Sequence, residues 1–267
     1  MTAIAHLRRL GTVLLPVLGV AVVLVAFELA PRAGVLPRNV FPPVSEIFAH
    51  LVTLVADGGL WTPLARTLGG WARSMAIAVI VAVPIGMLIG SSRLGALVLR
   101  IPIEFLRPIP SVALIPVLIL LYGTEGSGLK VALGAYGATF PLLFQASYGI
   151  ADIDPVARDT VRAFGLNAAW RLRHLVLPTM APYLATGIRL SAAVALILVI
   201  TGEYIVGLAG LGREVFTAQS AAAYHRMYAL IVVAGLLGLA VNTGLQTVER
   251  RVLRWHTSQR PSTVGAP

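Results

Sequence analysis

Six long apolar windows constrain this chain more than any other feature of its sequence. They lie at roughly residues 12–30, 68–90, 97–122, 129–150, 181–205 and 227–248. A helix needs ~20 mostly apolar residues to cross the ~30 Å of hydrocarbon in a bilayer. We therefore expect an all-α integral membrane protein with about six transmembrane helices, surrounded by membrane lipid.

The composition agrees with a membrane protein and argues against nucleic-acid binding. The chain is 57% hydrophobic and 12% charged, whereas soluble domains average roughly 45–50% apolar and 25% charged residues. The net charge of +10 comes almost entirely from arginines scattered between the apolar blocks, which is the distribution that orients membrane proteins. Cysteine is absent, so the chain has no disulfide, thiolate metal site or cysteine nucleophile.

The third window differs from the others because it is interrupted by proline. Each proline removes a backbone hydrogen bond and bends a helix. We expect this window to be kinked, or to begin as a re-entrant segment. The four prolines are Pro102, Pro108, Pro110 and Pro116.

The distribution of basic residues predicts the orientation. With the N-terminus inside, 12 of the 21 Lys and Arg residues fall in inner segments and 6 in outer ones. The positive-inside rule then places both termini of a multi-pass membrane protein in the cytoplasm. The first window follows Arg8 and Arg9 but is long and lacks an Ala-x-Ala site, so we expect an uncleaved anchor. We expect one transmembrane domain over residues 1–267, with a first span and external segment (1–65), a core bundle (66–253) and a cytoplasmic tail (254–267).

The most charged stretch, DPVARDTVRAFGLNAAWRLRHLVLPTMAP from Asp154, separates the fourth and fifth windows. Asp154 is a good N-cap and Pro155 suits the first helical position, while Gly165 suits a left-handed C-cap, so residues 155–164 should form a short helix. Asn167 can cap a second piece over residues 170–177, which Pro178 would stop. We expect a helical elbow across the cytoplasmic mouth.

Two readings of this elbow are open. It could be a solvated connector between two spans. However, Ala157, Val161 and Phe164 share one face of the first helix and Arg158 and Arg162 another. Two caps and exposed apolar residues are unnecessary in a connector but are needed in a helix that docks into a groove of a partner.

The spacing within the elbow resembles the cytoplasmic loop signature of ATP-binding-cassette (ABC) importer permeases. The signature begins with an acidic residue and two further residues, here Asp159, Thr160 and Val161. After three more residues comes a glycine, here Gly165. After another nine come an apolar residue, any residue, Leu and Pro, here residues 175–178. The usual Glu-Ala-Ala start is replaced by Asp-Thr-Val. Three other segments, FLRPIPSVALIPVLILLYG, ATFPLLFQASYGIADIDP and GEYIVGLAGLG, resemble the sulfonate, taurine and nitrate branch of that family, as does FPPVSEIFAHL nearer the N-terminus.

The resemblance implies a location in the bacterial plasma membrane and a division of labour among several subunits. Two permease subunits, copies or paralogues, form the pathway, two cytoplasmic ATPase subunits use ATP and Mg²⁺, and an external solute-binding protein delivers the solute. The elbow is then a coupling helix whose displacement rocks the bundle between inward-open and outward-open states. The implied coupling residues are Arg158, Asp159, Thr160, Val161, Arg162, Phe164, Gly165, Leu175, Leu177 and Pro178.

No motif for covalent chemistry is evident, so we expect no enzyme, no catalytic residue, no metal site and no cofactor bound by this chain. The segment GTEGSGLK over residues 123–130 approaches a phosphate-binding loop, but Leu129 precedes the lysine and the segment lies in an outer turn. No His-Glu-x-x-His or Gly-x-Ser-x-Gly occurs, and the five histidines are dispersed.

Ionisable residues at membrane depth are candidate pathway residues. Glu104 and Arg107 are three residues apart and could pair on one helix face, as a pathway element or a structural clamp. Arg189 could contribute to the pathway or extend to the membrane interface. Glu203 and Tyr204 could form a gate near the solute entrance or an interfacial anchor.

An ATP-independent secondary transporter or channel is the alternative function. Such transporters often contain related halves with matching broken helices, and residues 1–130 and 131–267 show no convincing repeat. For an importer we expect a small organic or inorganic anion or a vitamin-like precursor, as in the sulfonate, taurine and nitrate class. The solute itself is not encoded in any motif of this chain.

Overall fold

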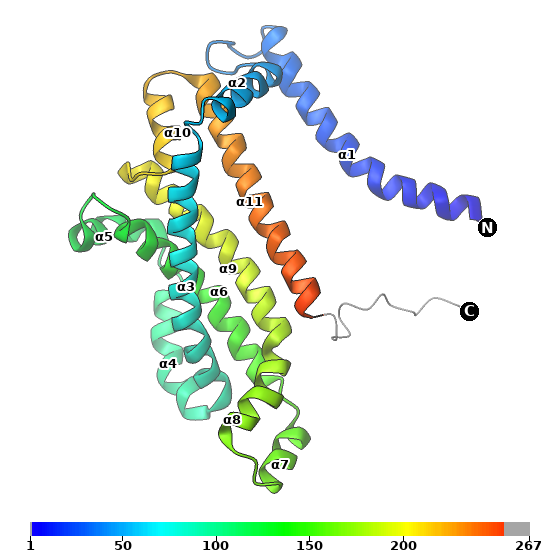
Figure 1. Ribbon diagram of the computed structural model, residues 1–267, viewed down its shortest axis with the longest axis vertical. Coiled ribbons are helices and arrows are strands. Elements are labelled where there is room, and N and C mark those ends of the chain that lie inside the picture. The colour runs from blue at the N-terminus through cyan, green and yellow to red at the C-terminus, as the bar shows by residue number, and fades with distance from the viewer. Residues whose placement is uncertain (1, 254–267) are drawn as a thin grey trace. The chain divides into compact units, whose positions relative to one another are not determined.

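The computed structural model of the protein describes residues 2–253 (Figure 1). The described residues form helices and no strands, which confirms the all-α class. In chain order the elements are α1 (Thr2–Arg32), α2 (Val44–Ala56), α3 (Trp61–Ser91), α4 (Arg93–Leu106), η1 (Ser111–Leu114), α5 (Ile115–Tyr122), α6 (Gly128–Ala151), α7 (Pro155–Ala163), α8 (Ala168–Arg171), η2 (Leu172–Val176), α9 (Leu177–Val206), α10 (Leu211–Ser220) and α11 (Tyr224–Val252).

Three stretches in the described chain are long and apolar enough to cross a membrane. They are α3, the continuous run Ala168–Val206 and α11. The helix pair Arg93–Leu106 and Ser111–Tyr122 makes a fourth if it is counted as one bent span. The windows at 12–30 and 129–150 lie in α1 and α6, which are outside this set. The membrane class is therefore confirmed, while the number six stays a prediction.

The proline-rich third window is broken, as expected. Its two halves meet at 85°, between Leu106 and Ser111. Pro108 and Pro110 lie in this break, and neither can donate the backbone hydrogen bond that a continuing helix needs. Pro116 lies in the first turn of α5, where the missing donor costs nothing.

The chain divides into two compact units. Unit 1 comprises Met1–Trp61 and Glu214–Val233, and unit 2 comprises Thr62–Arg213 and Ala234–Pro267. In unit 1, the Glu46 carboxylate lies 3.0 Å from His225 Nε2 and accepts a hydrogen bond of 2.8 Å from Arg38. The hydrogen bond with His225, followed by that from Arg38, lowers the pKa of Glu46 below its ordinary value. This carboxylate ties α2 to the beginning of α11.

Small residues let the helices of unit 2 pack closely. Ala138 of α6 and Ala192 and Ala195 of α9 are buried in one cluster, and Ser191 Oγ donates a 2.6 Å hydrogen bond to the Ala138 carbonyl. A Cβ at Gly86 of α3 would lie 2.7 Å from Ala146 Cβ, so only glycine fits there. Contacts between small side chains and interhelical hydrogen bonds are the usual basis of helix association in membranes.

Candidate functional site

The first half of the elbow folds as its sequence predicts. Asp154 Oδ1 accepts a 2.8 Å hydrogen bond from the backbone N–H of Val156 and so caps α7, whose first residue is Pro155. At the other end Gly165 has φ +64°. The N–H groups of Gly165 and Leu166 bond to the carbonyls of Arg162 and Val161, at 3.0 and 3.2 Å. This is a Schellman C-cap, which requires a left-handed residue at the position of the glycine.

The second half of the elbow begins as expected but does not end as expected. Asn167 Oδ1 accepts a 2.8 Å hydrogen bond from Trp170 N–H, which confirms it as the cap of α8. We expected Pro178 to stop this piece, and that is wrong: α8, η2 and α9 run on as one stretch, Ala168–Val206. A π-helical turn, η2, precedes the proline, which then lies in the first turn of α9. The wider turn accommodates the missing donor without ending the helix.

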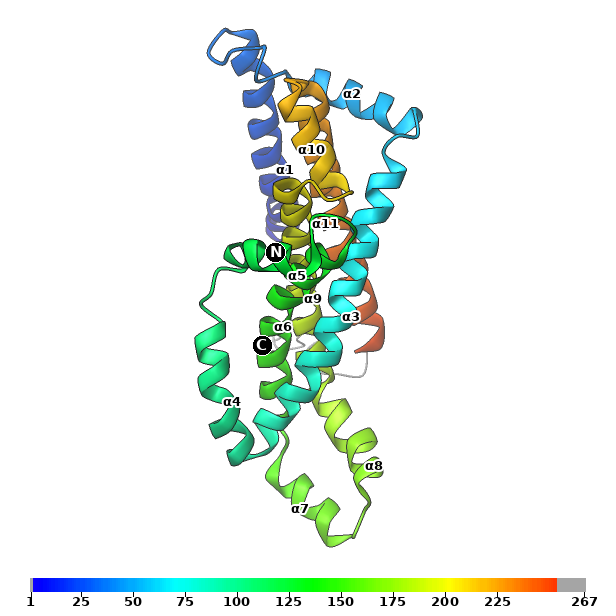
Figure 2. The same ribbon diagram turned by 90° about the vertical axis from the view of Figure 1, so that its left-hand side faces the viewer.

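The apolar face of α7 differs from the expectation at one residue. Val161 is only 7% exposed and packs into the chain, whereas Phe164 is 76% exposed. Val156, on the first turn of α7, is exposed as well. Val161 therefore anchors the elbow, and Val156 and Phe164 are its outward apolar residues. Figure 2 shows α7 and α8 at the end of unit 2 where α6 leads into the elbow and α9 begins.

The remaining apolar residues of the elbow are either packed against the chain, as Val161 is, or exposed, as Phe164 is. Leu175 is half-buried against a cluster that contains Ile150, Val176 and Met180. Leu177 is exposed and Pro178 half-buried.

The polar residues of α7 make only local contacts among the bonds described. The Thr160 hydroxyl donates to the Val156 carbonyl of its own helix. Asp159 and Arg162 form an exposed ion pair of 3.6 Å, a kind of pair that adds little stability.

A second polar site lies in unit 2, at the ends of α6 and α9 remote from the elbow. Lys130 Nζ of α6 and Glu203 Oε1 of α9 are 2.6 Å apart, and their side chains are 3% and 0% exposed. Glu203 Oε2 also accepts hydrogen bonds from Thr67 Oγ1 at 2.8 Å and from Gly212 N–H at 3.2 Å. Both oxygens of the buried carboxylate are therefore satisfied.

The ammonium group of Lys130 is equally well satisfied. Besides Glu203 it donates to the carbonyl oxygens of Ala209 at 2.7 Å and Arg66 at 3.3 Å. Three acceptors match the three N–H groups of an ammonium. A buried pair of charges is tolerated only when the remaining hydrogen-bonding positions are filled in this way.

This network joins four segments of unit 2. Thr67 of α3 donates to Glu203 and accepts from the N–H of Leu211, at 2.9 Å, so that α3, α6, α9 and the start of α10 are connected. A Cβ at Gly210 would overlap the Glu203 carboxylate, so glycine is required where this loop crosses the ion pair. We therefore define Lys130, Glu203 and Thr67 as the latch.

The latch changes how Glu203 is understood. The sequence offered Glu203 as a gate or an interfacial anchor, and in the structure its carboxylate is enclosed and paired. From the sequence, Lys130 was only the last residue of the outer segment 123–130, and its pairing with Glu203, 73 residues away, was missed. One signal was available, since Lys130 is the only lysine in the sequence. Tyr204, which follows Glu203 in the chain, is half-buried.

The other intramembrane candidates lie apart from the latch. Arg107 caps the end of α4, and its guanidinium lies over the Phe144 ring, 4.8 Å from the centroid. Arg189 of α9 is 3.9 Å from Glu249 of α11, a long ion pair. The pairing of Glu104 with Arg107 stays a prediction, as do the pathway roles of all five candidates.

The chain resembles known transport proteins over most of its length. The family model described as "Binding-protein-dependent transport system inner membrane component" matches residues 82–254. SsuC of Escherichia coli, named as an aliphatic sulfonates transport permease protein, is 31% identical over 94% of this chain and 93% of its own. The taurine transport system permease protein TauC of the same organism is 27% identical over 80% of each chain. The bicarbonate transport system permease protein CmpB of Synechococcus elongatus is 23% identical over 92% of each.

The fold also has a counterpart among solved structures. An inward-facing structure of the MetNI methionine ABC transporter contains a chain that aligns with a TM-score of 0.60 at 19% identity. The alignment covers 72% of this chain and 94% of that one. At this identity the similarity establishes the fold.

Proposed function

Because the chain belongs to the family of binding-protein-dependent transport system inner membrane components, the permease subunits of ABC importers, we propose that it forms the solute pathway of such an importer with a second permease subunit. The second subunit is a copy of this chain or a paralogue. Two cytoplasmic ATPase subunits bind the ATP and Mg²⁺, and an external protein delivers the solute. The permease is one domain with both termini in the cytoplasm.

The elbow is the proposed contact with the ATPase, and one observation carries this proposal. A rigidly capped helix presents the exposed Phe164 and Val156, while the buried Val161 holds it to its own chain. An apolar side chain held outward on a rigid helix is suited to insert into a partner's groove. The continuous helix Ala168–Val206 would carry a displacement of the elbow into the membrane, since it has no loop to absorb the motion.

The proposed solute is a small anion of the sulfonate, taurine and bicarbonate type. The names of the relatives motivate this class. A hollow of about 430 Å³ beside the latch adds support, because it is lined by Arg66, Arg73 and Arg213 against one carboxylate, that of Glu125. An excess of arginine attracts anions. In this proposal the external binding protein selects among them.

Reconstitution tests the proposal directly. The chain is placed in proteoliposomes with its cognate ATPase and binding protein, and uptake is measured for a panel of sulfonates, taurine, nitrate and bicarbonate. We expect uptake of one class of anion that requires ATP and both partners. Uptake by the chain alone, insensitive to ATP, would instead establish the secondary transporter or channel.

A further inference from the structure

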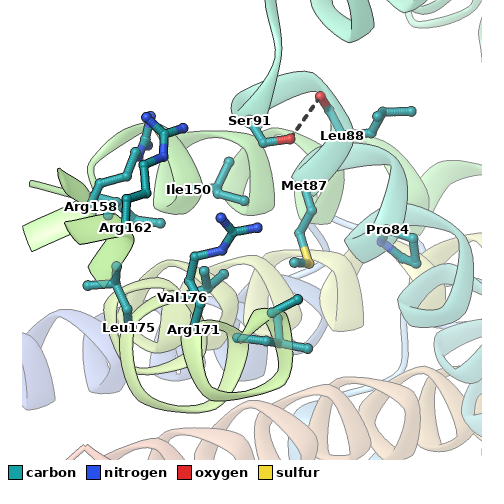
Figure 3. Close-up of a pocket in the computed structure, with 13 residues that line it drawn as sticks. Pro84, Met87, Leu88, Ser91, Ile150, Arg158, Arg162, Arg171, Leu175 and Val176 are labelled. Atoms are coloured by element: carbon teal, nitrogen blue, oxygen red, sulfur yellow. Dashed lines mark hydrogen bonds between the residues drawn. The ribbon is translucent and has the colours of Figure 1, made fainter. Parts of the chain in front are cut away.

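A cavity of about 590 Å³ lies between the elbow and the ends of two helices of unit 2 (Figure 3). Its apolar wall includes Met87 and Leu88 of α3 and Ile150 of α6. Arg158 and Arg162 of α7 and Arg171 of α8 line it from the side of the elbow. Figure 3 shows Arg171 beside Met87 and Ile150, with Arg158 and Arg162 close by. The volume falls within the roughly 300–1,000 Å³ of small-molecule sites.

The charges of this cavity are all of one sign. None of the described residues that line it is acidic. Arg162 forms a 3.6 Å ion pair with Asp159, but both side chains are exposed and solvent weakens the pair. Guanidinium groups present paired N–H donors that match the oxygen atoms of a phosphate group. The elbow side of the cavity is therefore suited to a phosphate.

The apolar wall narrows the class of ligand. Met87 and Ile150 lie within one or two turns of the ends of α3 and α6, at Ser91 and Ala151. These ends coincide with the limits of the second and fourth apolar windows, where we expect the hydrocarbon of the bilayer to end. The arginines belong to the elbow, just beyond that limit. A ligand that fits both sides carries a phosphate next to methylene groups.

We propose that this cavity binds the phosphate headgroup of an anionic phospholipid, with the three guanidinium groups on the phosphate and the first acyl carbons against Met87, Leu88 and Ile150. The proposed topology places the site on the cytoplasmic leaflet. Basic pockets between transmembrane helices on this side of a membrane are a recognised way to hold such headgroups. The lipid would hold the elbow against α3 and α6, and Arg171 separates this role from capture of the ATPase, because Arg158 and Arg162 are also implied coupling residues whereas Arg171 is not.

The test measures which lipid the purified full-length chain retains. The protein is equilibrated with vesicles of equal phosphatidylglycerol and phosphatidylcholine, and the bound lipid is counted by native mass spectrometry. We expect wild type to retain phosphatidylglycerol selectively. R171Q should reduce this selectivity about fivefold, and the triple variant R158Q/R162Q/R171Q about a hundredfold. R173Q is the matched control, because Arg173 is exposed on the same elbow but does not line the cavity.

Two further measurements separate the alternatives. Equal thermal stability of R171Q and R173Q in detergent shows that lost lipid binding is not lost folding, and R171Q alone carries the test if the triple variant misfolds. Inorganic phosphate is titrated against the chain in phosphatidylcholine vesicles. Arg171-dependent binding of phosphate without selectivity for phosphatidylglycerol would overturn the lipid in favour of a soluble anion, and undiminished selectivity in R171Q and the triple variant would overturn the site. Capture of the ATPase is measured separately, so that a failure of the coupling proposal can be distinguished from a failure of the lipid site.

Discussion

Lys130 and Glu203 form a buried ion pair of 2.6 Å, although they lie 73 residues apart on different helices. The pair is surrounded by hydrogen-bond partners from α3 and from the loop before α10. Its members depend on each other, because removing either charge leaves the other buried without compensation.

Removing one charge of the latch should therefore destabilise the protein more than replacing both charged residues with apolar ones. E203L or K130M alone should cost about 3–5 kcal/mol of unfolding free energy, whereas the double variant K130M/E203L should recover much of this loss. Denaturant unfolding of the purified chain in detergent measures all three. The exposed neighbour Arg213, changed to Gln, is the control. If the double variant loses the sum of the two single losses, the two residues do not act as a pair.

Gly165→Val should impair coupling rather than folding. A Cβ at Gly165 meets no atom within 4 Å, so the cost comes from its φ of +64° and should be on the order of 1–2 kcal/mol. This strain would redirect the chain towards α8 and so weaken ATPase capture and abolish transport. The matched control is Gly165→Asn, since Asn tolerates the left-handed conformation. D159A should be milder, because it removes an exposed charge and leaves the backbone unchanged. Pull-down of the ATPase, normalised to membrane-inserted permease, measures the effect, and normal capture by Gly165→Val would reduce the elbow to a connector.

Phe164 and Val161 should respond oppositely to truncation. F164A should leave stability nearly unchanged and reduce ATPase capture, because its side chain is exposed. V161A should lower the free energy of unfolding by on the order of 2 kcal/mol, because it removes buried methyl groups. Thermal unfolding and ATPase pull-down are measured on both variants. A large stability loss in F164A with capture intact would reverse this assignment.

Acid should weaken unit 1 through Glu46. The folded pKa of this carboxyl is lowered, chiefly by the hydrogen bond with His225, so its stabilising contribution is complete above the ordinary glutamate pKa of about 4.3 and is lost as the pH falls below it. E46Q should remove this contribution at neutral pH and flatten the acid limb of the stability curve. Melting temperatures of wild type and E46Q between about pH 7 and pH 3 provide the measurement. Parallel curves would show that another group is responsible.

The absence of cysteine gives a direct test of topology. E125C, in the turn before α6, should react with a membrane-impermeant maleimide added outside intact cells. R173C, on the elbow, should react only after permeabilisation. The proposed orientation requires this contrast, and the reverse pattern would invert the protein in the membrane.

Several local features of the elbow could be predicted from the sequence. The caps at Asp154 and Asn167 and the left-handed Gly165 are confirmed. Each depends on hydrogen bonds between residues no more than five positions apart, so the residues that decide it are adjacent in the sequence. The apolar windows are local in the same sense, since a helix in lipid satisfies its own backbone. The bend at Pro108 and Pro110 agrees with the loss of backbone donors at two prolines close together, whereas the single Pro102 lies inside α4.

Other features were decided only by the tertiary structure. No sequence pattern indicated that Val161 turns inward while Phe164 stays exposed, because that depends on which helix ends the elbow lies against. Pro178 continues a helix that it was expected to stop, because a π-helical turn precedes it. Lys130 and Glu203 come into contact only where α6 and α9 pack against each other. Local hydrogen bonds are specified by neighbours in the chain, whereas burial and ion pairing between helices depend on their packing, in which many weak contacts contribute together.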